Sequence, residues 1–158
     1  MKDIREVAAR YLEHKMRSVH EMKKRLREKD FDEEEIDELI EEFISLKYLD
    51  DYEYALHYIE YALGKKRGIQ RIKIELRERG ISEEDIFNAI SDYEEEHGIT
   101  ELQDALSVGR ELISGKLEID ERLTGRIVRK LRQRGYRDND IIKVVSILKD
   151  ELEAGSED

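Results

Sequence analysis

The chain has 158 residues, 44% of them charged, a formal net charge of −11, no proline and no cysteine. The absence of cysteine excludes disulfides and cysteine-ligated metals, and high charge without proline favours helices joined by short turns. There is no apolar signal core and no stretch long enough to span a bilayer, so we expect a soluble, cytoplasmic, all-α protein.

Residues 1–48 are expected to form three helices. Asp3 starts the first, which runs to about Lys15. Ser18 followed by Glu21 has the spacing of a capping box at the start of the second helix, and Asp32 starts the third. The apolar spacing predicts the inward positions Ala8, Ala9, Leu12, Val19, Met22, Leu26, Ile36, Leu39, Ile40 and Phe43.

Residues 49–98 repeat this plan. An aspartate pair, Asp50–Asp51, begins a helix that breaks at Gly64, and a second helix follows Gly68 and stops at Gly80. Ser82 is expected to cap the third helix, which ends near Gly98. The predicted inward positions are Ala55, Tyr58, Ile59, Ala62, Ile69, Ile72, Leu76, Ile86, Ala89, Ile90 and Tyr93.

Residues 99–153 form the third predicted unit, and residues 154–158 a polar, frayed tail. Thr100 is expected to cap the first helix, which breaks at Ser114–Gly115, and the second runs from about Asp120 to Arg134. The predicted inward positions are Leu102, Ala105, Leu106, Leu112 or Ile113, Ile127, Leu131, Ile141, Val144, Val145 and Leu148.

The three units are a degenerate tandem repeat with offsets of 50 and 55 residues. Leu26, Leu76 and Leu131 are in register, and so are Ile36, Ile86 and Ile141. Asp30 stands where the other two repeats have Gly80 and Gly135, at a helix end that favours a left-handed residue. Three tandem three-helix modules are therefore the expected fold, because such units complete their core by stacking on neighbours.

The chain lacks the patterns of a catalytic or metal site. Its four histidines have no metal-ligand spacing, and the Gly64–Gly68 segment lacks the spacing of a nucleotide-binding loop. His57 lies one helical turn from Glu53 and Glu60, which fits either a metal site or a solvated helix face, and we favour the solvated face. We therefore expect no enzyme, no cofactor and no metal.

Basic residues gather on the second helix of each unit, although the average charge is acidic. Six of them occupy two repeat positions in the last helical turn: Arg27, Arg77 and Arg132, and Lys29, Arg79 and Arg134. Either these cations offset the negative end of the helix dipole, or they bind an external anion. The dipole explains less well the ridge Arg126, Arg129 and Lys130, or the cations from Lys65 to Arg71 at a helix start.

The two helices flanking each glycine-containing turn resemble a helix-turn-helix in outline. In that motif, the N-terminal residues of the following helix reach the bases. Here those residues are acidic, Glu33–Glu35 and Glu83–Asp85, so sequence-specific reading of DNA is disfavoured. We interpret the acidic third helices as solvated faces, with DNA mimicry or repulsion between copies as alternatives.

The sequence resembles the RecX family of RecA regulators over nearly its whole length. The most specific match is YLDDYEYALHYIEYALGKKRGIQRIKIELRERGI, from Tyr48 to Ile81. SVHEMKKRLREKDFDEEEIDELI resembles the family's first repeat, and VRKLRQRGYRDNDI its third. The resemblance implies an elongated, curved, non-catalytic molecule that binds RecA filaments along their groove and dampens recombinase, ATPase and coprotease activities.

This resemblance makes the RecA filament the expected partner, with weak contact to single-stranded DNA through the filament, and we expect a monomer. The alternative is a helical-repeat adaptor that binds protein without touching nucleic acid. The candidate residues for contacting RecA or single-stranded DNA are Lys24, Arg27, Lys65, Lys66, Arg67, Arg71, Lys73, Arg77, Arg126, Arg129, Lys130 and Arg132.

Overall fold

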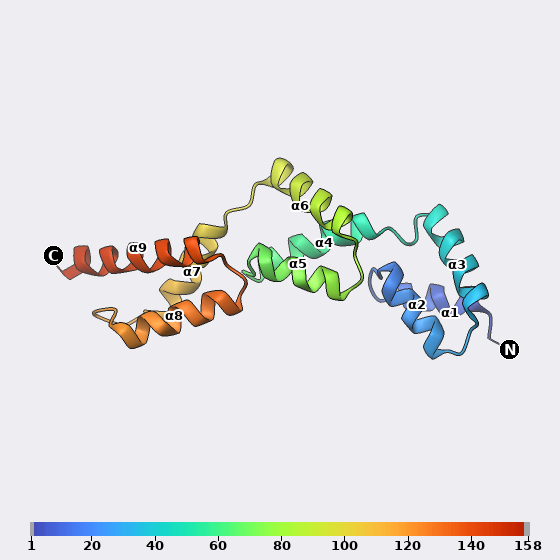
Figure 1. Cartoon of the computed structure of the whole chain (residues 1–158), viewed down its shortest axis with the longest axis horizontal. Helices are drawn as coiled ribbons and strands as arrows, with labels where there is room; N and C mark the ends of the chain where they lie inside the picture. Colours follow the sequence, from blue (N-terminus) through green and yellow to red (C-terminus); the bar gives the residue numbers. More distant parts are fainter. Residues whose placement is uncertain (1, 157–158) are drawn as a thin grey trace. The chain divides into compact units, whose positions relative to one another are not determined.

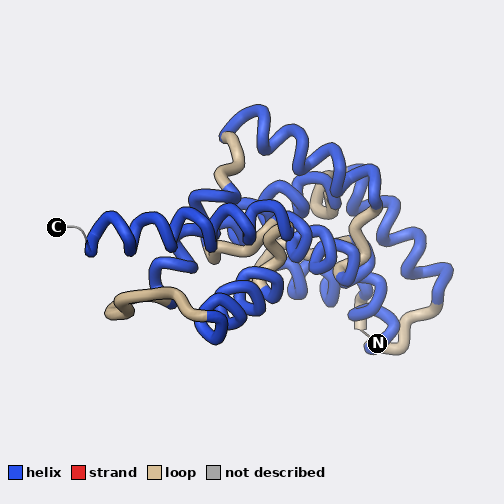
Figure 2. The backbone as a smooth tube through the Cα atoms, turned by 60° about the vertical axis from the view of Figure 1, so that its left-hand side comes forward, coloured by secondary structure: helices blue, strands red, loops and turns tan. Residues whose placement is uncertain are grey.

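The computed structural model describes residues 2–156, and within that range it contains helices and loops but no strand (Figure 2). The all-α prediction is therefore confirmed for the described chain. In order, the helices are α1 (Ile4–Leu12), α2 (Val19–Glu28), α3 (Glu33–Ser45), α4 (Asp51–Gly64), α5 (Ile69–Glu78), α6 (Glu83–His97), α7 (Glu101–Leu112), α8 (Glu121–Gln133) and α9 (Asp138–Ser156).

Short polar side chains start most of these helices, as predicted. Ser18 and Glu21 form a reciprocal capping box at α2, and the Asp32 side chain accepts a hydrogen bond from the Glu35 backbone N–H at α3. Ser82 caps α6 through the backbone N–H of Asp85, at 3.1 Å. Each of these bonds satisfies a backbone donor that has no partner inside the helix.

The chain falls into two compact units, which are described separately. Unit 1 comprises Met1–Ile59 and Glu75–Glu96, and unit 2 comprises Glu60–Ile74 and His97–Asp158. The division passes through α4 and α5, inside the second predicted repeat. The three-repeat domain boundaries therefore stay a prediction.

In unit 1, α1, α2 and α3 pack against one another (Figure 1). Their core contains Ala8, Met22, Leu26, Ile36, Leu39, Ile40, Phe43 and Leu49. These residues recur at helical spacing, so each helix buries one apolar stripe and exposes its charged face. The prediction for Ala9 is wrong, because its side chain is exposed, and Val7 and Tyr11 supply the inner face of α1 instead.

In unit 2, α7, α8 and α9 pack together in the same way (Figure 1). Their core contains Ala105, Leu106, Val108, Ile113, Leu123, Ile127, Leu131, Tyr136, Ile141, Val144 and Leu148. α9 continues to Ser156, beyond the predicted start of the frayed tail at residue 154. Residues 157–158 of that tail lie outside the described residues.

Each unit contains one junction between neighbouring repeats, and the two junctions use equivalent positions. In unit 1, the Val19 backbone N–H at the start of α2 donates to Asp51 Oδ1 at 2.9 Å. In unit 2, the Ile69 backbone N–H at the start of α5 donates to Glu101 Oε1 at 2.6 Å. The first residue of the opening helix of one repeat, Asp51 in α4 and Glu101 in α7, thus caps the middle helix of the repeat before it, where negative charge is favoured. Thr100, expected to be a cap, makes no side-chain capping bond.

The end of each following middle helix completes the junction. Ser18 Oγ donates to the Arg79 carbonyl at 2.7 Å in unit 1, and the Gly68 N–H donates to the Arg134 carbonyl at 2.7 Å in unit 2. Ser18 and Gly68 are 50 residues apart, and Arg79 and Arg134 are 55 apart, which are the offsets of the repeat. The periodicity of the sequence therefore reappears as a periodic set of contacts.

Candidate functional site

Unit 2 contains a basic hollow of about 320 Å³, here called the α5–α8 hollow. Its lining contains five cationic side chains, one amide and no acid: Lys65, Arg67, Arg71, Lys130, Gln133 and Arg134. Lys65 and Arg67 come from the turn between α4 and α5, and Arg71 comes from the first turn of α5. Lys130 and Gln133 come from the end of α8, and Arg134 is the residue that follows it.

The turn from Lys65 to Gly68 holds its shape by backbone hydrogen bonds. The Arg67 N–H donates to the Ala62 carbonyl at 3.1 Å, and Lys66 adopts a left-handed conformation with φ of 57°. Such a conformation is uncommon for a residue with a Cβ atom. The surrounding contacts must therefore stabilise it.

Those contacts come from the end of α8. Arg134 Nη1 donates to the Lys65 carbonyl at 2.8 Å, and the Tyr136 hydroxyl donates to the Lys66 carbonyl at 2.7 Å. Burial raises the pKa of the Tyr136 phenol, so the hydroxyl remains a donor at neutral pH. Together with the Gly68–Arg134 bond, these contacts join two segments that lie far apart in the sequence.

The hollow has the chemistry of an anion site. The Tyr61 ring lies beside two of its cations, with Lys65 Nζ 5.9 Å and the Arg67 guanidinium carbon 5.6 Å from the ring centroid. A lining that is rich in arginine and lysine and contains no acidic residue suits phosphate oxygens, which accept several charge-assisted hydrogen bonds. The site can therefore bind a phosphate group without recognising a base.

The structure brings together four of the predicted candidates, Lys65, Arg67, Arg71 and Lys130. Lys66 does not line the hollow, and its amine lies 3.9 Å from Asp104. Sequence reasoning did not select Arg134 and Gln133. The sequence indicates Arg134 only as a last-turn cation, and no spacing in it indicates that this residue meets the Lys65 carbonyl.

Three other candidates form the same ion pair in each repeat. Arg27 donates to Glu33 at 2.6 and 3.1 Å, Arg77 donates to both carboxylate oxygens of Glu83, and Arg132 donates to Asp138 at 2.9 Å. The bond to Glu33 raises the pKa of Arg27, and the same bond lowers the pKa of Glu33. Each arginine joins the end of a middle helix to the start of the third helix, which favours a structural role over anion binding.

The remaining candidates do not converge on the α5–α8 hollow. Lys24, Arg126 and Arg129 are exposed, and Lys73 is half-buried. The Arg129 guanidinium folds back over Gly125, where an added Cβ would lie 3.1 Å from Nη1. The predicted ridge is thus solvent-facing, and only its Lys130 reaches the hollow.

The described chain contains neither a metal cluster nor a membrane-spanning helix. Residues 2–156 contain no group of three or more side chains placed to hold a metal ion, and His57 Nε2 lies 3.9 Å from Glu53 on an exposed face. None of the helices in this range combines the length and apolar character needed to cross a bilayer.

Comparison with known proteins identifies the family. The model of the RecX first three-helix domain matches residues 5–43, and the model of the second matches residues 50–90. The chain belongs to the RecX family. RecX membership makes it a regulator of RecA, in a regulatory rather than enzymatic family, and connects it with DNA repair and homologous recombination.

Solved RecX structures share the fold. RecX from Lactobacillus salivarius is 22% identical, with a TM-score of 0.78 over 92% of this chain and 94% of that one. A second structure, described as regulatory protein RecX, is 22% identical, with a TM-score of 0.76 over 89% of this chain and 72% of that one. No curated protein matches the chain at a significant level.

Proposed function

We propose that this protein dampens RecA activity by docking in the groove of the RecA filament on single-stranded DNA. The observation that carries the proposal is the α5–α8 hollow, whose lining contains five cationic side chains and no acidic one. The protein is proposed to act as a cytoplasmic monomer, and the filament supplies most of its binding surface. Recombinase, ATPase and coprotease activities all depend on the filament, so one docking mode reduces all three.

The charge balance of the chain suits contact through a filament better than independent DNA binding. A net charge of −11 repels a polyanion at long range, whereas the hollow attracts one locally. Once RecA holds the protein near the DNA, the hollow needs to contact only a few phosphates. Each phosphate contact of this kind lowers the slope of log affinity against log salt by about 0.7 for a single strand.

The direct test is the binding of charge-reversal variants to RecA filaments on single-stranded DNA. Lys65→Glu/Lys130→Glu reverses two lysines of the hollow, and Lys116→Glu/Lys143→Glu reverses two exposed lysines of unit 2 outside it. Both variants change the net charge equally. We expect the first to weaken binding at least tenfold more than the second, and equal affinity of the two would reject the role of the hollow.

A protein-binding adaptor that does not touch nucleic acid is the second candidate. An apolar groove of about 500 Å³ between α8 and α9 favours it, with Val128, Ile141, Ile142 and Val145 in its lining. Ile142 is 67% exposed beside this groove, so its apolar surface is accessible to a partner. An adaptor would bind RecA with little salt dependence, whereas phosphate contacts give a steep dependence, so a salt titration separates the two candidates.

A further inference from the structure

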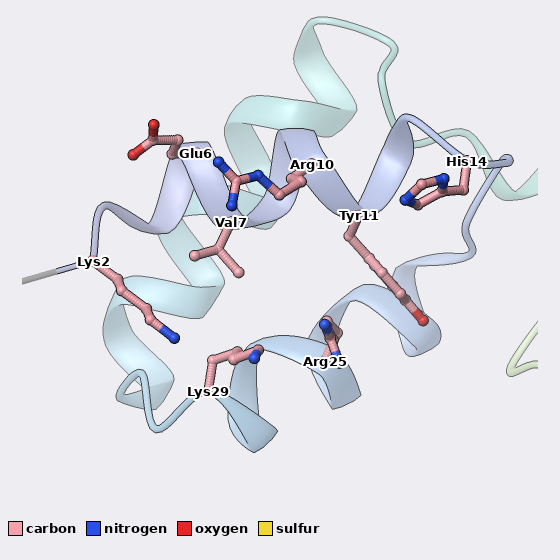
Figure 3. Close-up of a pocket in the computed structure, with 8 residues that line it drawn as sticks. All are labelled: Lys2, Glu6, Val7, Arg10, Tyr11, His14, Arg25 and Lys29. Atoms are coloured by element: carbon pink, nitrogen blue, oxygen red, sulfur yellow. The ribbon is translucent and has the colours of Figure 1, made fainter.

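A second basic hollow lies in unit 1, between α1 and α2 (Figure 3). It has a volume of about 300 Å³, and α1 with the residues flanking it contributes most of its lining. The lining residues are Lys2, Glu6, Val7, Arg10, Tyr11, His14, Arg25 and Lys29. It is here called the α1–α2 hollow, and it shares no residue with the α5–α8 hollow.

Two cations of this hollow occupy the same repeat positions as two cations of the other. Arg25 and Lys29 precede Lys130 and Arg134 by 105 residues, the sum of the two repeat offsets. Each pair therefore projects from the last turns of its middle helix toward a hollow on that side. In the second repeat, the equivalent positions hold Glu75 and Arg79, so the paired cations are confined to the first and third repeats.

Most cations of the α1–α2 hollow have no ionic partner. Within residues 2–156, Lys2, Arg10 and Lys29 form no ion pair. Arg5 of the same helix does not line the hollow and forms an ion pair with Glu42 at 2.9 Å. Arg25 has only a long contact of 3.9 Å with Glu28. Figure 3 shows the Glu6 carboxylate directed away from Arg25 and Lys29. The acid of the hollow therefore does not neutralise these cations.

Tyr11 lines the hollow, and its ring contacts two arginine side chains. The Arg25 guanidinium carbon lies 5.4 Å from the Tyr11 ring centroid, and that of Arg17 lies 3.8 Å from it. Arg17 Nε also donates to the Tyr11 carbonyl at 3.1 Å. Because Tyr11 packs against the core, these contacts restrict Arg25 before any ligand arrives, which lowers the entropy cost of binding.

We propose that the α1–α2 hollow binds two or three neighbouring phosphate groups of one molecule, separately from RecA. The ligand class covers consecutive phosphates of single-stranded nucleic acid and the polyphosphate of a nucleotide. The four permanent cations of the lining, Lys2, Arg10, Arg25 and Lys29, can contact several phosphates in a hollow of this size. Val7 and Tyr11, which pack against the core, supply the less polar part of the lining. This site goes beyond the proposed function, which rests on the α5–α8 hollow.

Lysine footprinting tests the site locally. The amines are acetylated at low salt and read by mass spectrometry, with the oligonucleotide (dT)12 and inorganic tripolyphosphate as separate probes. We expect one or both probes to slow the labelling of Lys29 several-fold, with exposed Lys143 as the internal reference. Slowing by tripolyphosphate identifies free polyphosphate as a ligand, and slowing by (dT)12 alone identifies the nucleic-acid backbone.

Two matched variants make the test specific. Arg10→Gln and Arg5→Gln remove one positive charge from the same helix, but only Arg10 lines the hollow. Arg10→Gln should abolish most of the protection of Lys29, and Arg5→Gln should leave it intact. Equal loss in both variants, or no protection of Lys29 by either probe, would overturn the proposal, and so would protection by oligoglutamate alone.

The same spectra separate this inference from the proposed function. Lys65 reports on the α5–α8 hollow, and Lys29 reports on the α1–α2 hollow. Protection of Lys65 without Lys29 rejects the further inference only. Protection of Lys29 without Lys65 supports the second site and counts against the phosphate role of the first.

Discussion

At the scale of single residues, positions 30, 80 and 135 share a backbone conformation but have different surroundings. Asp30, Gly80 and Gly135 all have positive φ, at 66°, 80° and 94°. An added Cβ on Gly80 would lie 2.2 Å from His20 Cβ, and one on Gly135 would lie 2.3 Å from Arg71 Cβ. Asp30 is exposed and carries its own Cβ. Glycine is thus required at the two junctions for space as well as for conformation.

We expect Gly80→Ala and Gly135→Ala each to lower the free energy of unfolding by about 2–4 kcal/mol, because backbone strain adds to overpacking. Gly115→Ala is the control, since Gly115 has φ of 78° but no atom within 4 Å of an added Cβ. That variant should cost only about 1 kcal/mol. Urea denaturation measures all three, and equal costs would show that the junctions are not closely packed.

Asp51 is a single residue whose ionisation should influence stability. Burial raises its pKa, against the lowering effect of the bond from the Val19 N–H, and Asp85, Asp50 and Glu21 raise it further. An acid with a raised folded pKa contributes stability that is present below its unfolded value, near 3.8, and is lost as pH rises through the folded value.

Asp51→Asn keeps an oxygen acceptor for the Val19 N–H without a buried charge. The difference in unfolding free energy, variant minus wild type, should therefore increase as pH rises from about 3.8 through the folded pKa, and then level off. Thermal melts across this range measure it. A difference that stays constant with pH would show that Asp51 titrates alike in the folded and unfolded states.

At the scale of elements, helix starts were the most predictable feature. Ser18, Asp32, Ser82 and Asp120 all cap as their sequence positions indicate. Thr100 does not, because a capping motif describes only local contacts. At α7, the next residue, Glu101, instead binds the start of α5, and local spacing cannot reveal an acceptor 32 residues away.

The α5–α8 hollow depends on the element that closes it, the turn from Lys65 to Gly68. Tyr136→Phe removes the bond to the Lys66 carbonyl and leaves the packing of the ring unchanged. We expect a loss of about 1 kcal/mol in unfolding free energy. We also expect weaker protection of Lys65 by (dT)12, whereas Lys29 should be unaffected. Unchanged stability and unchanged protection would show that this bond does not hold the turn.

At the scale of the whole molecule, the repeat and the helical fold follow from the sequence because they depend on periodicity. The register of Leu26, Leu76 and Leu131 is enough to locate three equivalent buried positions. The site was predicted less completely. Lys65 and Lys130 were both selected, but the backbone contacts of Arg134 that bring their segments together leave no pattern in the sequence.

Equivalent positions can also differ in role. Arg27, Arg77 and Arg132 form ion pairs with carboxylates, so this basic position of the repeat belongs to its helix-joining contacts. At the equally regular position two residues later, Lys29 and Arg134 line the two hollows. Repeat register alone therefore does not separate structural cations from candidate binding ones.

The most direct test of RecA regulation through the α5–α8 hollow is RecA ATP hydrolysis on single-stranded DNA, titrated with this protein at two salt concentrations. We predict inhibition at substoichiometric amounts, weaker at the higher salt. Lys65→Glu/Lys130→Glu should require much more protein than Lys116→Glu/Lys143→Glu for the same inhibition. Hydrolysis that is unaffected by the wild-type protein, or inhibited equally by both variants, would contradict this account.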